Sequence, residues 1–295
     1  MSKPLLSLSS AAGKNFRGFT LAEMVIVIII TGIIGAVVAV FIRAPVQGYV
    51  DTVARAELAD EADTAVRRMS RDLRLALPNS IRVTTSGPTV FLELLLTRTG
   101  GRYLDEEDGV AGGDILDFSN AADTSFRMVG PLPAGASQQI QVGDQLVIYN
   151  LGQGQADAYC AGASCNNRAA IAGINAGART ITLAANPFAL QTPVILRSPG
   201  HRFQVVSTPV TYACNATAGT LTRYSDYAIT ATQPVAEPVA GASRGLMGNG
   251  ITACTFNYAA LANVRSALVG ITLAMQRTGS GTVTLFHQVH VDNTP

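Results

Sequence analysis

The sequence predicts an α+β fold in which a long N-terminal helix, membrane-spanning in its first half and amphipathic in its second, packs on an antiparallel β-sheet domain. Three observations predict this fold. An uncharged, mainly apolar run extends from Val25 to Ile42. Apolar residues then recur with helical spacing from Gln47 to Leu77, and after Ser80 short strand-like runs alternate with turns rich in Gly, Pro and Asn.

The apolar run is long enough to cross a membrane. At about 1.5 Å per residue, a helix from Phe19 to Ile42 is roughly 36 Å long, and a hydrocarbon core is roughly 30 Å thick. Lys3, Lys14 and Arg17 precede the run, and no acidic residue does. Because positive charge is retained on the cytoplasmic side, we expect one span, an N-terminus in the cytoplasm and an exported C-terminal part.

The processing signal is unusual. An ordinary secretory signal has its small-residue cleavage site after the apolar run, whereas here Gly18 precedes the run and no Ala-x-Ala site follows Ile42. The stretch Gly-Phe-Thr-Leu-Ala-Glu ahead of an apolar helix resembles the prepilin signal of type IV pilins and of type II secretion pseudopilins. The resemblance implies that a prepilin peptidase cuts between Gly18 and Phe19, that the new amino group of Phe19 is methylated, and that Glu23 is retained.

The chemistry of Glu23 can be argued from the residues alone. A carboxylate within an apolar helix bundle costs several kcal/mol unless it is paired. Cleavage after Gly18 creates a cation at a similar depth, the amino group of Phe19, one helical turn away. We therefore expect a neighbouring helix, shifted along the axis, to bring its amine to this carboxylate, so that Glu23 sets the register of subunit addition. The alternative is a plain membrane anchor whose Glu lies near the interface.

Four segments follow from these patterns: a leader at residues 1–18, a transmembrane helix at 19–44, an amphipathic helix at 45–77, and a β-rich globular domain at 78–295. Pro45 permits a break or slight bend between the two helical segments. The amphipathic helix has one apolar stripe and one charged face. The stripe consists of Leu58, Ala62, Val66, Met69, Leu73 and Leu77, and the charged face of Arg55, Glu57, Asp60, Glu61, Asp63, Arg67, Arg68, Arg71 and Arg74.

The globular domain contains ten expected strands, several of which alternate apolar and polar residues as a half-buried antiparallel sheet does. Residues 98–200 are less regular and richer in Gly and Ala, so we expect an irregular insertion there, with a second small sheet as one arrangement. The expected strands are Ile81–Thr85, Val90–Thr97, Asp114–Phe118, Gln145–Asn150, Thr180–Leu183, Phe203–Ala213, Leu221–Ile229, Ile251–Tyr258, Leu268–Met275 and Thr282–Val291.

Charge and cysteine content narrow the functional class. The chain has 21 basic and 20 acidic residues, and loss of residues 1–18 removes three of the basic ones, so nothing favours nucleic-acid binding. The four cysteines lie in the exported part, where disulfides form. We expect a local Cys160–Cys165 bond and a Cys214–Cys254 bond between two strands. The sequence has no Cys-x-x-Cys pair and no His close to either pair of cysteines, so a metal site is not expected. No cofactor is expected either.

The resemblance extends beyond the signal. Residues 45–50, 71–80 and 287–291 are similar to those of MshO-type minor pilins of the mannose-sensitive haemagglutinin (MSHA) pilus, and J-type minor pseudopilins have a similar layout. The likeness implies a non-enzymatic minor pilin that takes part in assembly or priming at the pilus tip. Its expected partners are the prepilin peptidase, the inner membrane and other pilin subunits, which it contacts through the N-terminal helix. From the inner membrane it is expected to enter the pilus at the cell surface. The alternatives are a type II secretion pseudopilin and a tip adhesin for a surface glycan.

The sequence contains four weaker motifs. Ser243 lies in a Gly-x-Ser-x-Gly pattern, but the flanking residues predict a loop rather than a nucleophile elbow, and a membrane-tethered hydrolase is only a distant alternative. His287 and His290 are three apart on an expected strand, so they face opposite sides and cannot chelate one ion. The acidic cluster at residues 105–108 is a minor calcium candidate. Tyr212, Tyr224 and Tyr227 are the tyrosines that could form an aromatic platform for a glycan.

Overall fold

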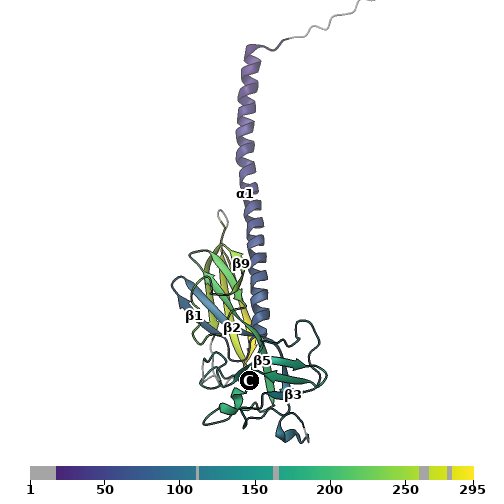
Figure 1. Ribbon diagram of the computed structural model, residues 1–295. Coiled ribbons are helices and arrows are strands. Elements are labelled where there is room, and N and C mark those ends of the chain that lie inside the picture. The colour runs from purple at the N-terminus through teal and green to yellow at the C-terminus, as the bar shows by residue number, and fades with distance from the viewer. Residues whose placement is uncertain (1–17, 111–112, 162–165, 259–265, 278–280) are drawn as a thin grey trace, which may run out of the picture. The chain divides into compact units, whose positions relative to one another are not determined.

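The computed structural model describes residues 18–110, 113–161, 166–258, 266–277 and 281–295 (Figure 1). The chain divides into two compact units, Met1–Val53 and Ala54–Pro295. The described part contains one long α-helix and two antiparallel sheets, so the predicted α+β class is confirmed.

Helix α1 spans Leu21–Arg74 and contains Pro45, which does not end it. The helix stops three residues before the predicted end at Leu77, because the chain there turns to pair with a strand. Ala76 forms a bridge with Leu96, and the Leu77 N–H donates to the Leu95 carbonyl at 2.8 Å. The backbone groups after the helix therefore find their partners in the sheet.

The larger sheet has nine strands within the described residues, in the order β1-β2-β3-β6-β5-β4-β7-β8-β9, and all its pairings are antiparallel. Two single-turn 3-10 helices, η1 (Glu106–Asp108) and η3 (Pro187–Leu190), lie in its loops. The strands are β1 Arg82–Ser86, β2 Thr89–Tyr103, β3 Ser125–Val129, β4 Gln145–Val147, β5 Arg168–Asn175, β6 Thr180–Leu183, β7 Arg202–Asn215, β8 Thr220–Ser225 and β9 Ser243–Asn249.

Part of this sheet closes into a small barrel. Strands β2, β3, β6, β5, β4 and β7 are neighbours in that order, and β7 also pairs with β2, from Thr89 opposite Asn215 to Arg102 opposite Arg202. The barrel encloses its own apolar cluster, to which all six strands contribute. The predicted irregular insertion at 98–200 thus contains β3 to β6 and the end of β2, and forms most of a closed barrel.

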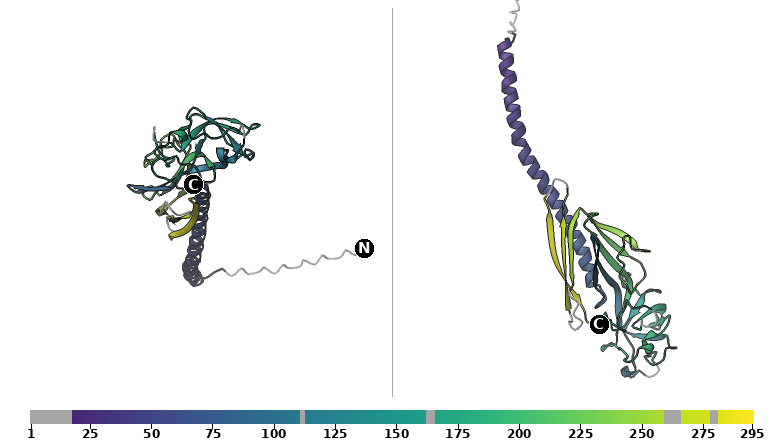
Figure 2. Two further views of the ribbon diagram at one scale, coloured as in Figure 1. Left: turned by 90° about the horizontal axis from the view of Figure 1, so that it is seen from below. Right: turned by 90° about the vertical axis from the view of Figure 1, so that its left-hand side faces the viewer.

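The smaller sheet, β10-β11-β12, consists of Ile251–Tyr258, Ser266–Met275 and Val283–Asp292. Within the second unit, the Ala54–Arg74 part of α1 lies between this sheet and the β2, β7 and β8 strands of the larger one, as the right-hand view of Figure 2 shows. The predicted apolar stripe supplies the contact: Leu58, Met69 and Leu73 are fully buried. The stripe is therefore covered on two sides.

Several strand predictions differ from the structure. Asp114–Phe118 is not a strand, although Leu116 and Phe118 are buried in the barrel core. Strands β3, β5 and β9 were not predicted. Strand β5 consists mainly of Ala, Gly and Asn, which have low β-propensity, and pairing with β4 and β6 outweighs that preference.

Candidate processing and assembly site

The predicted cleavage junction precedes the helix. Gly18, Phe19 and Thr20 are not helical, and α1 begins at Leu21. Gly18 is exposed, a Cβ added to it would meet nothing within 4 Å, and Phe19 is 77 % exposed. A peptide bond outside regular structure and free of neighbours is accessible to a peptidase, so the geometry permits cleavage between Gly18 and Phe19.

Thr20 and Glu23 form a reciprocal cap at the start of α1. The Glu23 N–H donates to the Thr20 Oγ1 at 3.2 Å, and the Thr20 N–H donates to the Glu23 Oε2 at 3.4 Å. This is a capping box, which satisfies backbone donors that the first turn of a helix leaves unpaired. The carboxylate also lies at the positive end of the helix dipole. Thr20 therefore holds the side chain of Glu23 back toward the helix start, one turn from Phe19.

The helix beyond Glu23 presents an apolar surface. No charged residue lies between Glu23 and Arg43, and α1 contains a segment long and apolar enough to cross a membrane, none of it buried within the protein. Thr31 lies within this segment, and its hydroxyl donates to the Val27 carbonyl at 2.7 Å. The segment thus has no charge beyond its first turn, and its threonine hydroxyl is satisfied within the helix, as a hydrocarbon environment requires.

This arrangement determines what Glu23 can bind. Its Oε2 accepts the Thr20 N–H, and within the described residues no hydrogen bond reaches its Oε1. A carboxylate can accept several hydrogen bonds, so a cation from a neighbouring helix can bind without disrupting the cap. The roles of Gly18, Phe19 and Glu23 in processing and register nevertheless remain predictions.

The predicted Cys214–Cys254 disulfide is present, with the Cα atoms 6.5 Å apart. It joins β7 of the larger sheet to β10 of the smaller one, beside the core that surrounds α1. The two sheets therefore have a covalent link where they cover the helix. Cys165 lies outside the described residues, so the Cys160–Cys165 bond remains a prediction.

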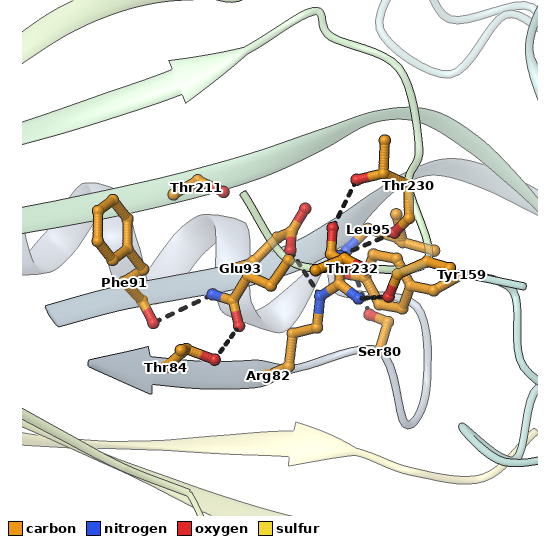
Figure 3. A network of polar contacts seen from close by, with 12 residues as sticks. Ser80, Arg82, Thr84, Phe91, Glu93, Leu95, Tyr159, Thr211, Thr230 and Thr232 are labelled. Carbon is orange, nitrogen blue, oxygen red and sulfur yellow. Dashed lines mark hydrogen bonds and ion pairs between the residues drawn. The ribbon is translucent and has the colours of Figure 1, made fainter. Parts of the chain in front are cut away.

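A buried polar network joins β1, β2 and two loops (Figure 3). Arg82 and Glu93 are opposite one another on β1 and β2, and the Arg82 Nε donates to the Glu93 Oε2 at 2.6 Å. The Arg82 Nη1 donates to the Ala231 carbonyl and its Nη2 to the Thr230 carbonyl, and the guanidinium carbon lies 3.7 Å from the Tyr159 ring centroid. Arg82 therefore holds both loops against the sheet through hydrogen bonds and a cation–π contact.

Glu93 is fully buried at the centre of this network. Its Oε1 accepts the Tyr227 hydroxyl at 2.8 Å, and Tyr227 also shares a hydrogen bond with Thr211. Burial raises the pKa of Glu93 above its ordinary value, although Arg82 and Tyr227 act in the opposite direction. The network extends to Gln233, which accepts from Thr84 and donates to the Phe91 carbonyl. The network therefore holds the β1 and β2 strands and the adjoining loops together.

A second buried acid, Asp72, connects α1 to the larger sheet. Its Oδ2 accepts the Tyr212 hydroxyl at 2.7 Å and the Arg223 Nε at 2.8 Å. Burial and this carboxylate raise the pKa of Tyr212. Asp72 is thus neutralised within the protein and anchors the end of α1 to β7 and β8.

The weaker candidates are not assembled into sites. Ser243 begins β9, with a turn before it and a strand after it, so the nucleophile elbow does not form. His287 lies on the face of β12 that packs on the core side with Leu285, and His290 is exposed. Tyr212, Tyr224 and Tyr227 are all buried, Tyr212 toward α1 and the other two in a separate cluster. They provide no exposed platform for a glycan.

Two acids of the cluster at residues 105–108 form ion pairs. Asp105 pairs with Arg197 at 3.2 Å, and Asp108 pairs with Arg102. The backbone N–H of Asp105, which donates to Asp108, lowers the pKa of that carboxyl group. No group of three or more His, Cys, Asp or Glu side chains in the described residues is arranged to hold a metal ion.

Sequence reasoning missed two features of the site. The spacing Thr20-x-x-Glu23 is the signature of a capping box, so this signal was present in the sequence. The pairing of Arg82 with Glu93 depends on the β1–β2 register and on the distant Tyr227, which no local pattern indicates.

One comparison with known proteins matches the start of the chain. Residues 13–39 match the family model of the prokaryotic N-terminal methylation motif. Neither a curated protein nor a solved structure matches the chain. The matched segment contains the predicted cleavage junction, the capping box and the start of the apolar helix. The motif and the apolar helix together support a type IV pilin-like or pseudopilin-like protein, compatible with an inner-membrane anchor.

Proposed function

We propose that this chain is a minor pilin of a type IV pilus, of the MSHA type represented by MshO. A prepilin peptidase cuts between Gly18 and Phe19, and the amino group of Phe19 is methylated. The mature subunit then takes part in pilus assembly or priming, at the tip of the filament.

One observation carries the proposal: Glu23 is held by Thr20 at the start of an otherwise uncharged apolar helix, one turn from the residue whose amine cleavage would expose. A lone carboxylate is costly in an apolar bundle, and an amine from an adjoining helix removes that cost. In this proposal the pair sets the register in which subunits join.

The same geometry supports a location and a set of partners. Before assembly the subunit is a single-pass inner-membrane protein with a cytoplasmic N-terminus and a periplasmic globular domain. Its partners are the prepilin peptidase and other pilin or minor pilin subunits, contacted through α1. The disulfide at Cys214–Cys254 is consistent with an oxidising, exported location.

A type II secretion pseudopilin is the alternative that the same motif supports. The glycan-binding alternative gains no aromatic platform from Tyr212, Tyr224 and Tyr227, because all three are buried. No observation on the described residues favours it.

The experiment compares three variants of the full chain, produced with its peptidase in cells that assemble the filament. Glu23→Ala should insert and be cleaved normally, yet enter filaments roughly tenfold less, since it leaves the neighbouring amine unpaired. Glu23→Gln retains the cap but not the charge and should be equally impaired. Thr20→Ala loses the cap but keeps the charge, so its defect should be smaller. Normal filament entry by Glu23→Ala would remove the proposed register role.

A further inference from the structure

The exposed face of α1 near its C-terminal end has a shallow hollow of about 410 Å³, lined by Thr64, Arg67, Arg68, Arg71 and Asp72. The opposite face of this part of α1 is buried between the two sheets. The hollow is therefore on the side of the helix that the globular domain leaves uncovered.

The hollow is cationic. Arg67 is paired with Asp63 at 2.6 Å. Arg68, Arg71 and Arg74 are exposed, and their side chains form no ion pair or hydrogen bond within the described residues. Asp72 does not balance them, because its side chain is only 11 % exposed and its carboxylate is neutralised by Tyr212 and Arg223.

Stabilisation of the helix dipole explains only part of this pattern. Arg71 and Arg74 lie in the last turn, where a cation is favourable. Arg68 lies further from the end, where the effect of the dipole has largely decayed. The three arginines also form a line along one face with a repeat of three residues, about 4.5 Å per step. Such a row suits a row of carboxylates on another helix better than a single small anion.

The same helix carries a matching acidic row. Glu57, Asp60 and Asp63 have the same three-residue repeat, on the same solvent-facing side, and each precedes its basic counterpart by eleven residues. Arg277, which also binds Glu61, contacts Glu57 through Oε2 at 2.7 Å, and Arg67 contacts Asp63 through Oδ2 at 2.6 Å. Both are exposed pairs, which contribute about 1 kcal/mol or less, so they leave the acidic row able to bind other cations.

We propose that Arg68, Arg71 and Arg74 bind the acidic row, Glu57, Asp60 and Asp63, of a second copy of this chain. An offset of eleven residues corresponds to three helical turns, or about 16 Å along the axis. This offset differs from the one-turn shift that pairs the Phe19 amine with Glu23, so the two contacts join different neighbours. The inference rests on the proposed function, since filament assembly is what brings parallel helices together.

The test uses two differently tagged full-length copies, produced together with the peptidase in membranes and filaments. One copy carries Thr64→Cys and the other Val53→Cys, which the three-turn offset places opposite each other. Both side chains are exposed. We expect a cross-link between the copies that an unshifted pair, Thr64→Cys in both, does not form. An equal yield from the unshifted pair would overturn the inference.

Charge reversal then tests the arginines. Arg68→Glu with Arg71→Glu in the Thr64→Cys copy should lower the cross-link roughly tenfold, and Glu57→Arg with Asp60→Arg in the other copy should restore it. The control, Arg202→Glu with Arg244→Glu, changes two exposed arginines elsewhere and should have no effect. An unchanged yield after reversal, or no restoration, would overturn the inference.

The test separates this inference from the proposed function. Mass spectrometry of the same samples reports cleavage after Gly18, and purified filaments report entry of the subunit. Normal cleavage and entry without the shifted cross-link would refute only the contact between copies. Loss of both cleavage and entry would refute the proposed function, and the contact with it.

Discussion

Arg82 and Glu93 face each other across β1 and β2 with 2.6 Å between Nε and Oε2, and the carboxylate is completely buried. A buried acid of this kind depends on its partner, because an unpaired charge in the interior costs far more than an exposed one. Arg82 additionally holds the Thr230–Ala231 backbone and stacks on Tyr159. The stability of the globular domain should therefore be sensitive to this residue.

We predict that Arg82→Ala lowers the free energy of unfolding by about 3–5 kcal/mol at pH 7, since it leaves Glu93 unpaired. The matched control is Arg67→Ala, which breaks an exposed pair with Asp63 and should cost about 1 kcal/mol or less. Urea unfolding of both variants measures the difference. Equal losses in the two variants would contradict the role assigned to the network.

The raised pKa of Glu93 gives a pH dependence with a definite sign. Because the folded state favours the protonated form, the contribution of Glu93 is complete below its unfolded pKa of about 4.3 and is lost as pH rises through the higher folded pKa. We expect wild type to lose stability relative to Glu93→Gln as pH rises from about 4 toward neutrality. Unfolding of both proteins at several pH values measures this, and a difference that grows in favour of wild type would be contrary to expectation.

The disulfide between Cys214 and Cys254 should contribute strongly to stability, because it closes a loop with a sequence separation of 40. The chain-entropy relation gives about 4 kcal/mol for such a loop. We predict a loss of this size for Cys214→Ala with Cys254→Ala, measured by chemical unfolding. A variant as stable as the oxidised protein would refute the prediction.

Local patterns predicted the elements whose signal is contained in a short stretch. The apolar run and the repeat of Leu58, Met69 and Leu73 define α1, because helical packing selects residues three and four apart. The barrel was not predicted, since its closure depends on the distant β2–β7 pairing and on the weakly β-forming β5. Such contacts are properties of the folded chain rather than of any one segment.

The residues of the candidate site likewise differ in whether a local sequence pattern can identify them. Gly18, Phe19 and Glu23 were identified because the motif is contiguous. The link between Asp72 and Tyr212 spans 140 residues, and the Glu93 network depends on strand register. The predicted end of α1 is Leu77, whereas the helix ends at Arg74 because Ala76 forms a bridge to Leu96 of β2. A helical repeat does not indicate such a bridge.

The most direct test of the account is the N-terminus of the protein in assembled filaments, determined by mass spectrometry of the intact subunit and its first peptide. We predict a chain that begins at Phe19 with a methylated amino group. A subunit that retains residues 1–18, or begins elsewhere, would lack the cation that Glu23 is proposed to bind and would contradict the account.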